Sequence, residues 1–280
     1  MTVDGGVDEQ AGWSERIDTS TPHPARRYNY WLGGKDNFAA DRESGDAIAK
    51  VFPAIRTTAL ENRAFLRRAV RFLAAEAGVR QFLDVGTGIP TANNTHEVAQ
   101  SIAPESRIVY VDNDPIVLTH ARALLTSTPQ GATAYIDADL RDPASILAHD
   151  SVRGTLDFDR PIALMLIAIV HFLFDEHRPY DTVRRLVDAL PSGSYVVMTH
   201  GTSDLASAAM RQHAEEEIRS GRLRLDAVPR SKDEIARFFD GLELVDPGIA
   251  PIVEWRSTVP PQDRPPLADA ALYGVVARVP

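Results

Sequence analysis

Short apolar runs alternate with amphipathic segments along most of the chain, from Gly78 onward. The runs are rich in branched and aromatic side chains and end at polar or glycine residues, which is typical of buried β-strands. An alternation of strands and helices predicts parallel strands joined by right-handed crossovers, and therefore an α/β fold. The predicted strands are residues 81–85, 107–111, about 132–137, 162–167 and 195–199.

Capping residues mark several helix starts within this alternation. Asp114 and Asp142 each precede a proline, which is favoured at the first helical position because its missing N–H would have no partner there. Ser231 and Glu234 have the spacing of a capping box, and the helix that they open leads to a short strand at 242–245. With a last strand at 273–279, this strand is predicted to form a terminal hairpin.

Two more helices are predicted outside the minimal alternation. Thr58 and Glu61 have capping-box spacing, so we expect a helix to begin at residue 58. Its apolar stripe, which predicts packing on a core, is Phe65, Leu66, Ala69, Val70, Phe72 and Leu73. Residues 202–222 have a helical composition and are expected to form an insertion over one end of the sheet.

The first 57 residues follow neither pattern. Residues 1–21 are mainly small, polar and acidic, which predicts a disordered tail. Residues 26–43 combine aromatics, two adjacent glycines and many charges without a helical or strand period. We therefore divide the chain into a tail at 1–21, an N-terminal helical or lid extension at 22–57 and a main domain at 58–280.

Composition narrows the class of protein. A chain of 280 residues suits one large α/β domain or two small ones, each with a sizeable core. Its 30 basic and 39 acidic residues give a formal charge of -9, which argues against a broad surface for nucleic acid or an anionic membrane. The longest apolar run, 162–174, is too short to span a bilayer, and no secretory signal is recognisable. The chain has no cysteine, which excludes disulfides and fits a reducing compartment, so a cytoplasmic location is expected.

Three consecutive strand ends carry the groups that an adenosine needs. The first strand runs into a turn with Gly86 and Gly88, where a ligand can approach the backbone closely. Asp112 ends the second strand and can accept both hydroxyl hydrogens of a ribose. Asp139 and Leu140 follow the third strand, where a carboxylate could accept from the adenine amino group and an apolar side chain could pack on the ring.

Both NAD and S-adenosylmethionine contain adenosine, and the glycine turn discriminates between them. The dinucleotide fingerprint needs a third glycine, and Thr91 stands in its place. Asp84 at the strand end would repel a pyrophosphate but suits the ammonium and sulfonium groups of S-adenosylmethionine. The turn therefore favours the sulfonium ligand, and nicotinamide-dependent reduction remains a weaker hypothesis.

With these motifs the chain resembles the class I S-adenosylmethionine-dependent methyltransferases. The resemblance covers about residues 65–280 and implies a Rossmann-like, seven-stranded, mainly parallel sheet of order 3214576, with the last strand antiparallel and helices on both faces. More narrowly, residues 26–43 and 83–90 resemble the family catalogued as S-adenosyl methyltransferase, formerly a domain of unknown function. The resemblance implies S-adenosylmethionine as cofactor and S-adenosylhomocysteine as product. The cofactor contacts that it implies are Asp84, Gly86, Thr87, Gly88, Asp112, Asn113, Asp139, Leu140 and Ala168.

The unusual composition of residues 28–38 predicts a lid over the cofactor. Aromatic side chains such as Tyr30 can cover the adenine or the methionine chain. Gly33 and Gly34 permit positive backbone angles or a close approach, and Lys35 can satisfy a carboxylate or hydroxyl. The alternative is a structural turn that connects helices.

Two histidines are candidates for acid–base chemistry. His171 and His200 follow the fourth and fifth strands, which the resemblance makes neighbours in the sheet. Either could take a proton from a substrate oxygen or nitrogen, or could serve only as a polar wall of the pocket.

No metal or nucleic-acid site is expected. The eight histidines lack paired ligand spacing, and the fourth strand ends in apolar residues where a metal-dependent methyltransferase would need acids. The residues after that strand, 167–171, also differ from the Asn/Asp-Pro-Pro-aromatic turn of the enzymes that methylate amino groups in nucleic acids. With the acidic charge, this favours a small-molecule acceptor. Protein substrates stay open.

These patterns predict an S-adenosylmethionine-dependent methyltransferase that works by direct displacement, with catalysis mainly through alignment and desolvation. A cofactor-binding regulatory protein without turnover is the alternative from a different class.

Overall fold

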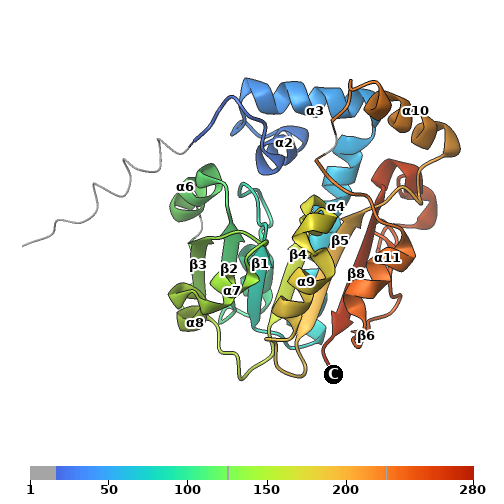
Figure 1. Cartoon of the computed structure of the whole chain (residues 1–280). Helices are drawn as coiled ribbons and strands as arrows, with labels where there is room; N and C mark the ends of the chain where they lie inside the picture. Colours follow the sequence, from blue (N-terminus) through green and yellow to red (C-terminus); the bar gives the residue numbers. More distant parts are fainter. Residues whose placement is uncertain (1–16, 125, 225) are drawn as a thin grey trace, which may run out of the picture.

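The computed structural model describes residues 17–280, except 125 and 225. Its centre is one eight-stranded sheet with the order β3-β2-β1-β4-β5-β8-β6, on which β7 also pairs with β8 (Figure 1). The parallel strands are β1 (Gln81–Val85), β2 (Arg107–Asp112), β3 (Ala132–Asp137), β4 (Ala163–Ile167) and β5 (Tyr195–Gly201). The antiparallel strands are β6 (Glu243–Leu244), β7 (Ala250–Pro251) and β8 (Leu272–Arg278).

The predicted sheet is confirmed in type and differs in one detail. All five parallel strands lie within two residues of their predicted bounds. Four of them are mostly buried apolar runs, whereas β3 at the edge of the sheet buries only Ile136. The last strand lies antiparallel between β5 and β6, as the order 3214576 requires, and it forms the predicted hairpin with β6. The expectation of seven strands is wrong, since the two-residue strand β7 adds to the sheet. A pair of residues that contains a proline is too short to be recognised by periodicity.

Helices cover both faces of the sheet, because side chains alternate between the faces along each strand. On one face, Leu83 and Val109 belong to a core that also includes side chains of α7 (Pro143–Ala148), α8 (Asp150–Thr155), α9 (Pro179–Val187) and α11 (Lys232–Ala236). On the other face, Phe82 and Ile108 share a core with α4 (Ile55–Arg71), its π-helical extension η1 (Phe72–Glu76) and α5 (Thr95–Ile102).

Most predicted helix starts are confirmed, and one is wrong. Asp142 accepts from the Ser145 N–H at the start of α7, and Ser231 and Glu234 form the capping box of α11. The helix α6 (Pro115–Leu124) begins after Asp114. The helix α4, however, begins at Ile55 rather than at residue 58, so Thr58 is no cap; its hydroxyl donates instead to the Asp269 carbonyl at 2.9 Å.

The N-terminal segment contains two helices, as expected for a helical extension, although residues 26–43 have no helical period in the sequence. They are α2 (Pro24–Trp31) and α3 (Ala39–Val51), which lie across the carboxyl ends of the parallel strands (Figure 1). The buried residues of α2 are Arg26, Arg27 and Asn29, so its inner face has no apolar period to recognise. The predicted tail falls mainly on residues 1–16, outside the described part, while residues 17–21 form neither helix nor strand.

The predicted insertion is the helix α10 (Ala208–Arg219), which lies beside α3 (Figure 1). It has no buried residue, in agreement with its polar composition. Within the described part of the chain, none of the helices has the length and apolar character needed to cross a bilayer.

Candidate functional site

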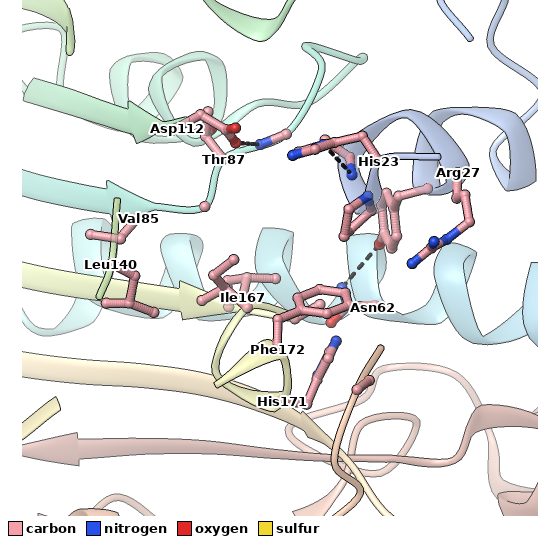
Figure 2. Close-up of a pocket in the computed structure, with 18 of the residues that line it drawn as sticks. His23, Arg27, Asn62, Val85, Thr87, Asp112, Leu140, Ile167, His171 and Phe172 are labelled. Carbon is pink, nitrogen blue, oxygen red and sulfur yellow. Dashed lines mark hydrogen bonds between the residues drawn. The ribbon is translucent and has the colours of Figure 1, made fainter. Parts of the chain in front are cut away.

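A cavity of about 440 Å³ lies at the carboxyl ends of the parallel strands (Figure 2). One wall, the strand side, consists of residues that follow β1 to β4. The opposite wall, the helix side, consists of residues from α2, α4, the turn η2 (Val170–Phe172) and the segment around Asp226. The predicted site residues that line the cavity are Asp84, Gly86, Thr87, Gly88, Asp112, Asn113, Asp139, Leu140, Ala168 and His171.

The glycine turn after β1 requires glycine at both positions. Gly86 has φ +75°, and a Cβ there would lie 2.5 Å from the Ile169 side chain. Gly88 has φ +69°, and a Cβ there would meet no atom within 4 Å. The turn is therefore packed against β4 on one side and leaves room for a ligand on the other.

Asp112 is the acid that holds this turn to β2. One of its carboxylate oxygens accepts from the Gly88 N–H at 2.8 Å, and the other accepts from the Asp114 N–H at 3.0 Å. Burial raises the pKa of Asp112, while these two hydrogen bonds oppose the rise. Each oxygen retains a further lone pair, so the carboxylate can accept two more hydrogens from a ligand.

Asp84 lies at the end of β1 and is only 4% exposed. Its carboxylate accepts from the Thr95 hydroxyl at 2.6 Å. Burial raises the pKa of Asp84 to about 6, against the lowering effects of this hydrogen bond and of Arg63. A buried carboxylate without a bound cation is poised to stabilise a positively charged ligand group.

Asp139 and Leu140 follow β3 and line the cavity. Arg141 and Asn113 both donate to the Asp139 carboxylate, the Asn113 amide at 2.8 Å. Burial raises the pKa of Asp139, but these hydrogen bonds outweigh it and lower the pKa to about 2. Leu140 is buried and offers an apolar surface beside the charge.

The end of β4 has an unusual backbone. Ala168 lies in the left-handed region at φ +53°, which is uncommon for a residue other than glycine. Its N–H donates to the Thr199 hydroxyl at 2.8 Å, so the neighbouring strand β5 holds this conformation. Such strained backbone is found mainly at functional sites.

The structure separates the two candidate histidines. His171 lines the cavity, and its Nδ1 accepts from the Gly201 N–H at 3.4 Å. His200 does not line the cavity, because it is fully buried with Nδ1 donating to the Gly201 carbonyl at 2.8 Å and Nε2 accepting from Arg230 at 3.0 Å. The expectation that both histidines face the substrate is therefore wrong for His200.

Burial makes both imidazoles weak bases. It lowers the pKa of His171 to about 3, with further lowering by His200 and Arg230. It lowers the pKa of His200 to about 4. Both rings are therefore neutral at pH 7 and bind a proton weakly.

The predicted lid residues Tyr30, Gly33, Gly34 and Lys35 do not line the cavity. The Tyr30 hydroxyl donates to Asp46, and Lys35 is exposed. Gly33 does have a positive φ, and a Cβ on Gly34 would lie 2.3 Å from the Asn29 amide, so both glycines serve the turn after α2. The residues of α2 and its start that line the cavity instead are His23, Pro24, Ala25, Arg27, Tyr28 and Trp31.

Two ion pairs, of which the Arg26–Asp114 pair is buried, attach α2 to the rest of the cavity wall. Arg26 donates to both carboxylate oxygens of Asp114, at 2.8 and 2.9 Å, directly after the strand that carries Asp112. Arg27 forms an ion pair with Asp226, which lies beyond α10. These pairs connect residues far apart in the sequence, so no local motif indicates them.

The helix side also includes Asn62 and Arg63 of α4, which were not predicted. Asn62 is 1% exposed and lies on the same helix face as Phe65 and Leu66. A polar residue within an apolar helical stripe is a sequence signal that could have identified Asn62 as a site residue. Among residues 17–280, with the two gaps noted above, no group of three or more His, Asp or Glu is placed to hold a metal ion.

Comparisons with known proteins agree with this geometry. A model of the family described as S-adenosyl methyltransferase matches residues 10–280. A structure of a DUF574 family protein from Streptomyces avermitilis is 51% identical, with a TM-score of 0.88 over 95% of this chain and 100% of that one. The crystal structure of a protein from Thermobifida fusca, described there as a proposed methyltransferase, is 42% identical, with a TM-score of 0.82 over 98% of this chain and 99% of that one. No curated protein matches the chain.

The fold and the family match define the class: this is a Rossmann-like protein of the S-adenosylmethionine-dependent methyltransferases. Within that class, the chain belongs to the S-adenosyl methyltransferase family. The family's cofactor is S-adenosylmethionine, and the open space above Gly88 beside buried acids on the strand side fits it.

Proposed function

We propose that the protein transfers a methyl group from S-adenosylmethionine to a small-molecule acceptor held on the helix side of the cavity. The observation that supports this most strongly is the row of carboxylates at three neighbouring strand ends, Asp84, Asp112 and Asp139, in one cavity. The cofactor supplies a methyl carbon made electrophilic by the sulfonium.

The strand side has groups for several polar parts of that cofactor. Asp112 has lone pairs left for the two ribose hydroxyls, and Leu140 can pack on the adenine. Asp139 would have to exchange a hydrogen bond from Arg141 or Asn113 to accept from the adenine amino group. Asp84, with its pKa raised by burial, gains a favourable charge partner in the ammonium or sulfonium. The remaining contribution of the chain is to align the acceptor and exclude water.

A small acceptor and a cytoplasmic location belong to this proposal. They are supported by the mainly apolar lining of the cavity, by the net charge of -9 and by the cysteine-free composition. Fractionation of cells that express a tagged full-length chain would check the location.

Two measurements test the proposed function. Calorimetry with the full chain should show binding of S-adenosylmethionine and S-adenosylhomocysteine, and a screen of small molecules with methyl-labelled cofactor should yield a labelled product. Tight binding of NADH, with no affinity for either sulfur ligand, would contradict the proposal.

A regulatory S-adenosylmethionine-binding protein is the second candidate, because neither predicted histidine is a free base. His200 has both ring nitrogens occupied, and the pKa of His171 is lowered to about 3 by burial. Tight cofactor binding with no labelled product from small molecules or from a cell extract would favour this function.

A further inference from the structure

The helix side of the cavity contains a buried hydrogen-bond acceptor without a partner, the Asn62 Oδ1. The Asn62 Nδ2 donates to the Tyr28 hydroxyl at 2.9 Å, and this hydroxyl donates to the Ala59 carbonyl at 3.0 Å. The only hydroxyl proton of Tyr28 is therefore used, so the Asn62 atom that faces it must be the amide nitrogen. This fixes the amide orientation and leaves Oδ1 in need of an N–H or O–H donor.

The surface of the cavity that Asn62 lines is mainly apolar. Figure 2 shows Asn62, Phe172 and His171 on the helix side of the cavity. Trp31 and Leu66 also line the cavity. A molecule that satisfies Asn62 must therefore combine a hydrogen-bond donor with an apolar, flat body.

The protonation state of His171 is fixed by a chain of buried hydrogen bonds. Arg230 donates to His200 Nε2, and His200 Nδ1 donates to the Gly201 carbonyl. The Gly201 N–H donates to His171 Nδ1, which must therefore be the unprotonated nitrogen of a neutral ring. The His171 Nε2 then carries the hydrogen and is a donor, not a base.

The groups on the described helix side that could accept a proton each already have a partner. His23 lines the cavity, and its Nδ1 accepts from the Ala25 N–H at 3.3 Å and lies 3.2 Å from the Asp114 carboxylate. The Asp226 carboxylate is in an ion pair with Arg27, and the Tyr28 hydroxyl already donates to a carbonyl. An alcohol or phenol that attacks a methyl group must lose its proton within the site, whereas an uncharged amine needs no base during the attack. Alkylamines are cations at neutral pH, while aromatic amines are uncharged.

We propose that the methyl acceptor is an uncharged aromatic amine, whose N–H donates to Asn62 Oδ1 while its ring occupies the apolar helix side. This inference rests on the proposed methyltransferase function. The nitrogen lone pair forms the new C–N bond as the C–S bond breaks, and the electron pair of that bond goes to sulfur. The products are S-adenosylhomocysteine and a protonated N-methylamine, which gives its proton to water after release.

The test uses three probes that share one ring: 2-naphthylamine, 2-naphthol and 2-naphthylmethylamine, which is a cation at neutral pH. Methyl transfer is measured with labelled cofactor and the full chain, and binding of each probe is measured by calorimetry on the protein saturated with S-adenosylhomocysteine. We expect 2-naphthylamine to be bound and methylated at least about tenfold more efficiently than the other two. A preference for 2-naphthol, or methylation and binding of none of the three, would overturn the inference.

Variants of Asn62 test the contact itself. Asn62→Leu removes the acceptor atom at similar size, and we expect it to weaken binding and methylation of 2-naphthylamine about tenfold while S-adenosylhomocysteine affinity changes less than twofold. Asn62→Asp keeps an acceptor oxygen but adds a carboxylate that can take a proton, so it should still bind 2-naphthylamine and should raise methylation of 2-naphthol relative to the wild type. Unchanged amine methylation in Asn62→Leu would overturn the inference.

Measurements of cofactor binding distinguish failure of the proposed methyltransferase function from failure of the aromatic-amine inference. Loss of S-adenosylhomocysteine binding in the wild-type chain would refute the proposed function itself. Retained cofactor binding with transfer to the phenol would refute only the aromatic amine. Thermal unfolding of each variant shows that the comparison is made between folded proteins.

Discussion

The two sides of the cavity are built in different ways. The strand side consists of residues directly after β1, β2, β3 and β4, so the backbone of one sheet sets their positions. The helix side brings together α2, α4, η2 and the segment around Asp226, which are distant in the sequence. Its geometry depends on individual buried contacts such as Arg26 with Asp114. The comparison teaches that a cofactor site can be fixed by the fold, whereas an acceptor site can vary with a few side chains.

The largest effect should come from breaking the ion pair that attaches the helix side to the strand side. Arg26→Met leaves the Asp114 carboxylate, whose side chain is fully buried, without its charge partner, so we expect a loss of about 3–5 kcal/mol in the free energy of unfolding. Because α2 would be loosened, S-adenosylhomocysteine should also dissociate faster in stopped-flow experiments.

A matched double variant, Arg26→Met with Asp114→Asn, separates charge from packing. It removes the unpaired charge and should recover part of the stability without restoring slow release of the ligand. Equal stability and release in Arg26→Met and the wild type would show that this pair does not hold the helix side in place.

The second largest effect should be the pH dependence of S-adenosylmethionine affinity, which we attribute to Asp84. Because burial places the pKa of Asp84 at about 6 in the free protein, binding of a cationic ligand below pH 6 must displace a proton. Affinity for S-adenosylmethionine should therefore fall by up to about tenfold per pH unit below pH 6 and level off above it. Asp84→Asn should reduce this slope, although the raised pKa of Asp112 contributes as well. A flat calorimetric pH profile in the wild type would contradict the role of Asp84.

Asp84→Asn should also stabilise the folded protein at neutral pH. The pKa of Asp84 is near its ordinary value of 3.8 in the unfolded chain and is raised by burial to about 6 in the folded protein, so the folded state binds more protons between these values. Stability is therefore lost as pH rises from about 4 to 6, and Asp84→Asn should raise the free energy of unfolding at pH 7 by roughly 1–3 kcal/mol. Denaturant titrations at pH 4 and pH 7 would measure this, and a destabilised variant at pH 7 would contradict it.

The same contrast explains what the sequence could predict. The strands, the turn at Gly86 and Gly88, and Asp112 follow from apolar runs and from the rule that ligands bind at the carboxyl ends of parallel strands. The helix α2 escaped prediction because it buries Arg26, Arg27 and Asn29. The carboxylate partners of the two arginines, Asp114 and Asp226, lie 88 and 199 residues away in the chain. Hydrophobic periodicity does not reveal a helix whose buried face is charged.

The smallest effects should come from the residues that composition suggested and the structure places outside the cavity. Tyr30→Phe removes a hydroxyl that donates to Asp46, and Lys35→Ala removes an exposed side chain. Neither should change S-adenosylhomocysteine affinity by more than about twofold, since surface substitutions away from a site have little effect. A tenfold loss in either variant, measured by calorimetry, would mean that residues 28–38 close over the ligand as the composition first indicated.

The division between the two sides can be tested by one comparison of S-adenosylhomocysteine affinity, measured by calorimetry in Asp112→Ala and Asn62→Leu. Asp112→Ala should weaken binding about a hundredfold or more, because two charge-assisted hydrogen bonds to the ribose are lost. Asn62→Leu should bind within twofold of the wild type, because Asn62 belongs to the acceptor and not to the cofactor. Equal losses in the two variants, or wild-type affinity in Asp112→Ala, would contradict this assignment of the strand side to the cofactor and the helix side to the acceptor.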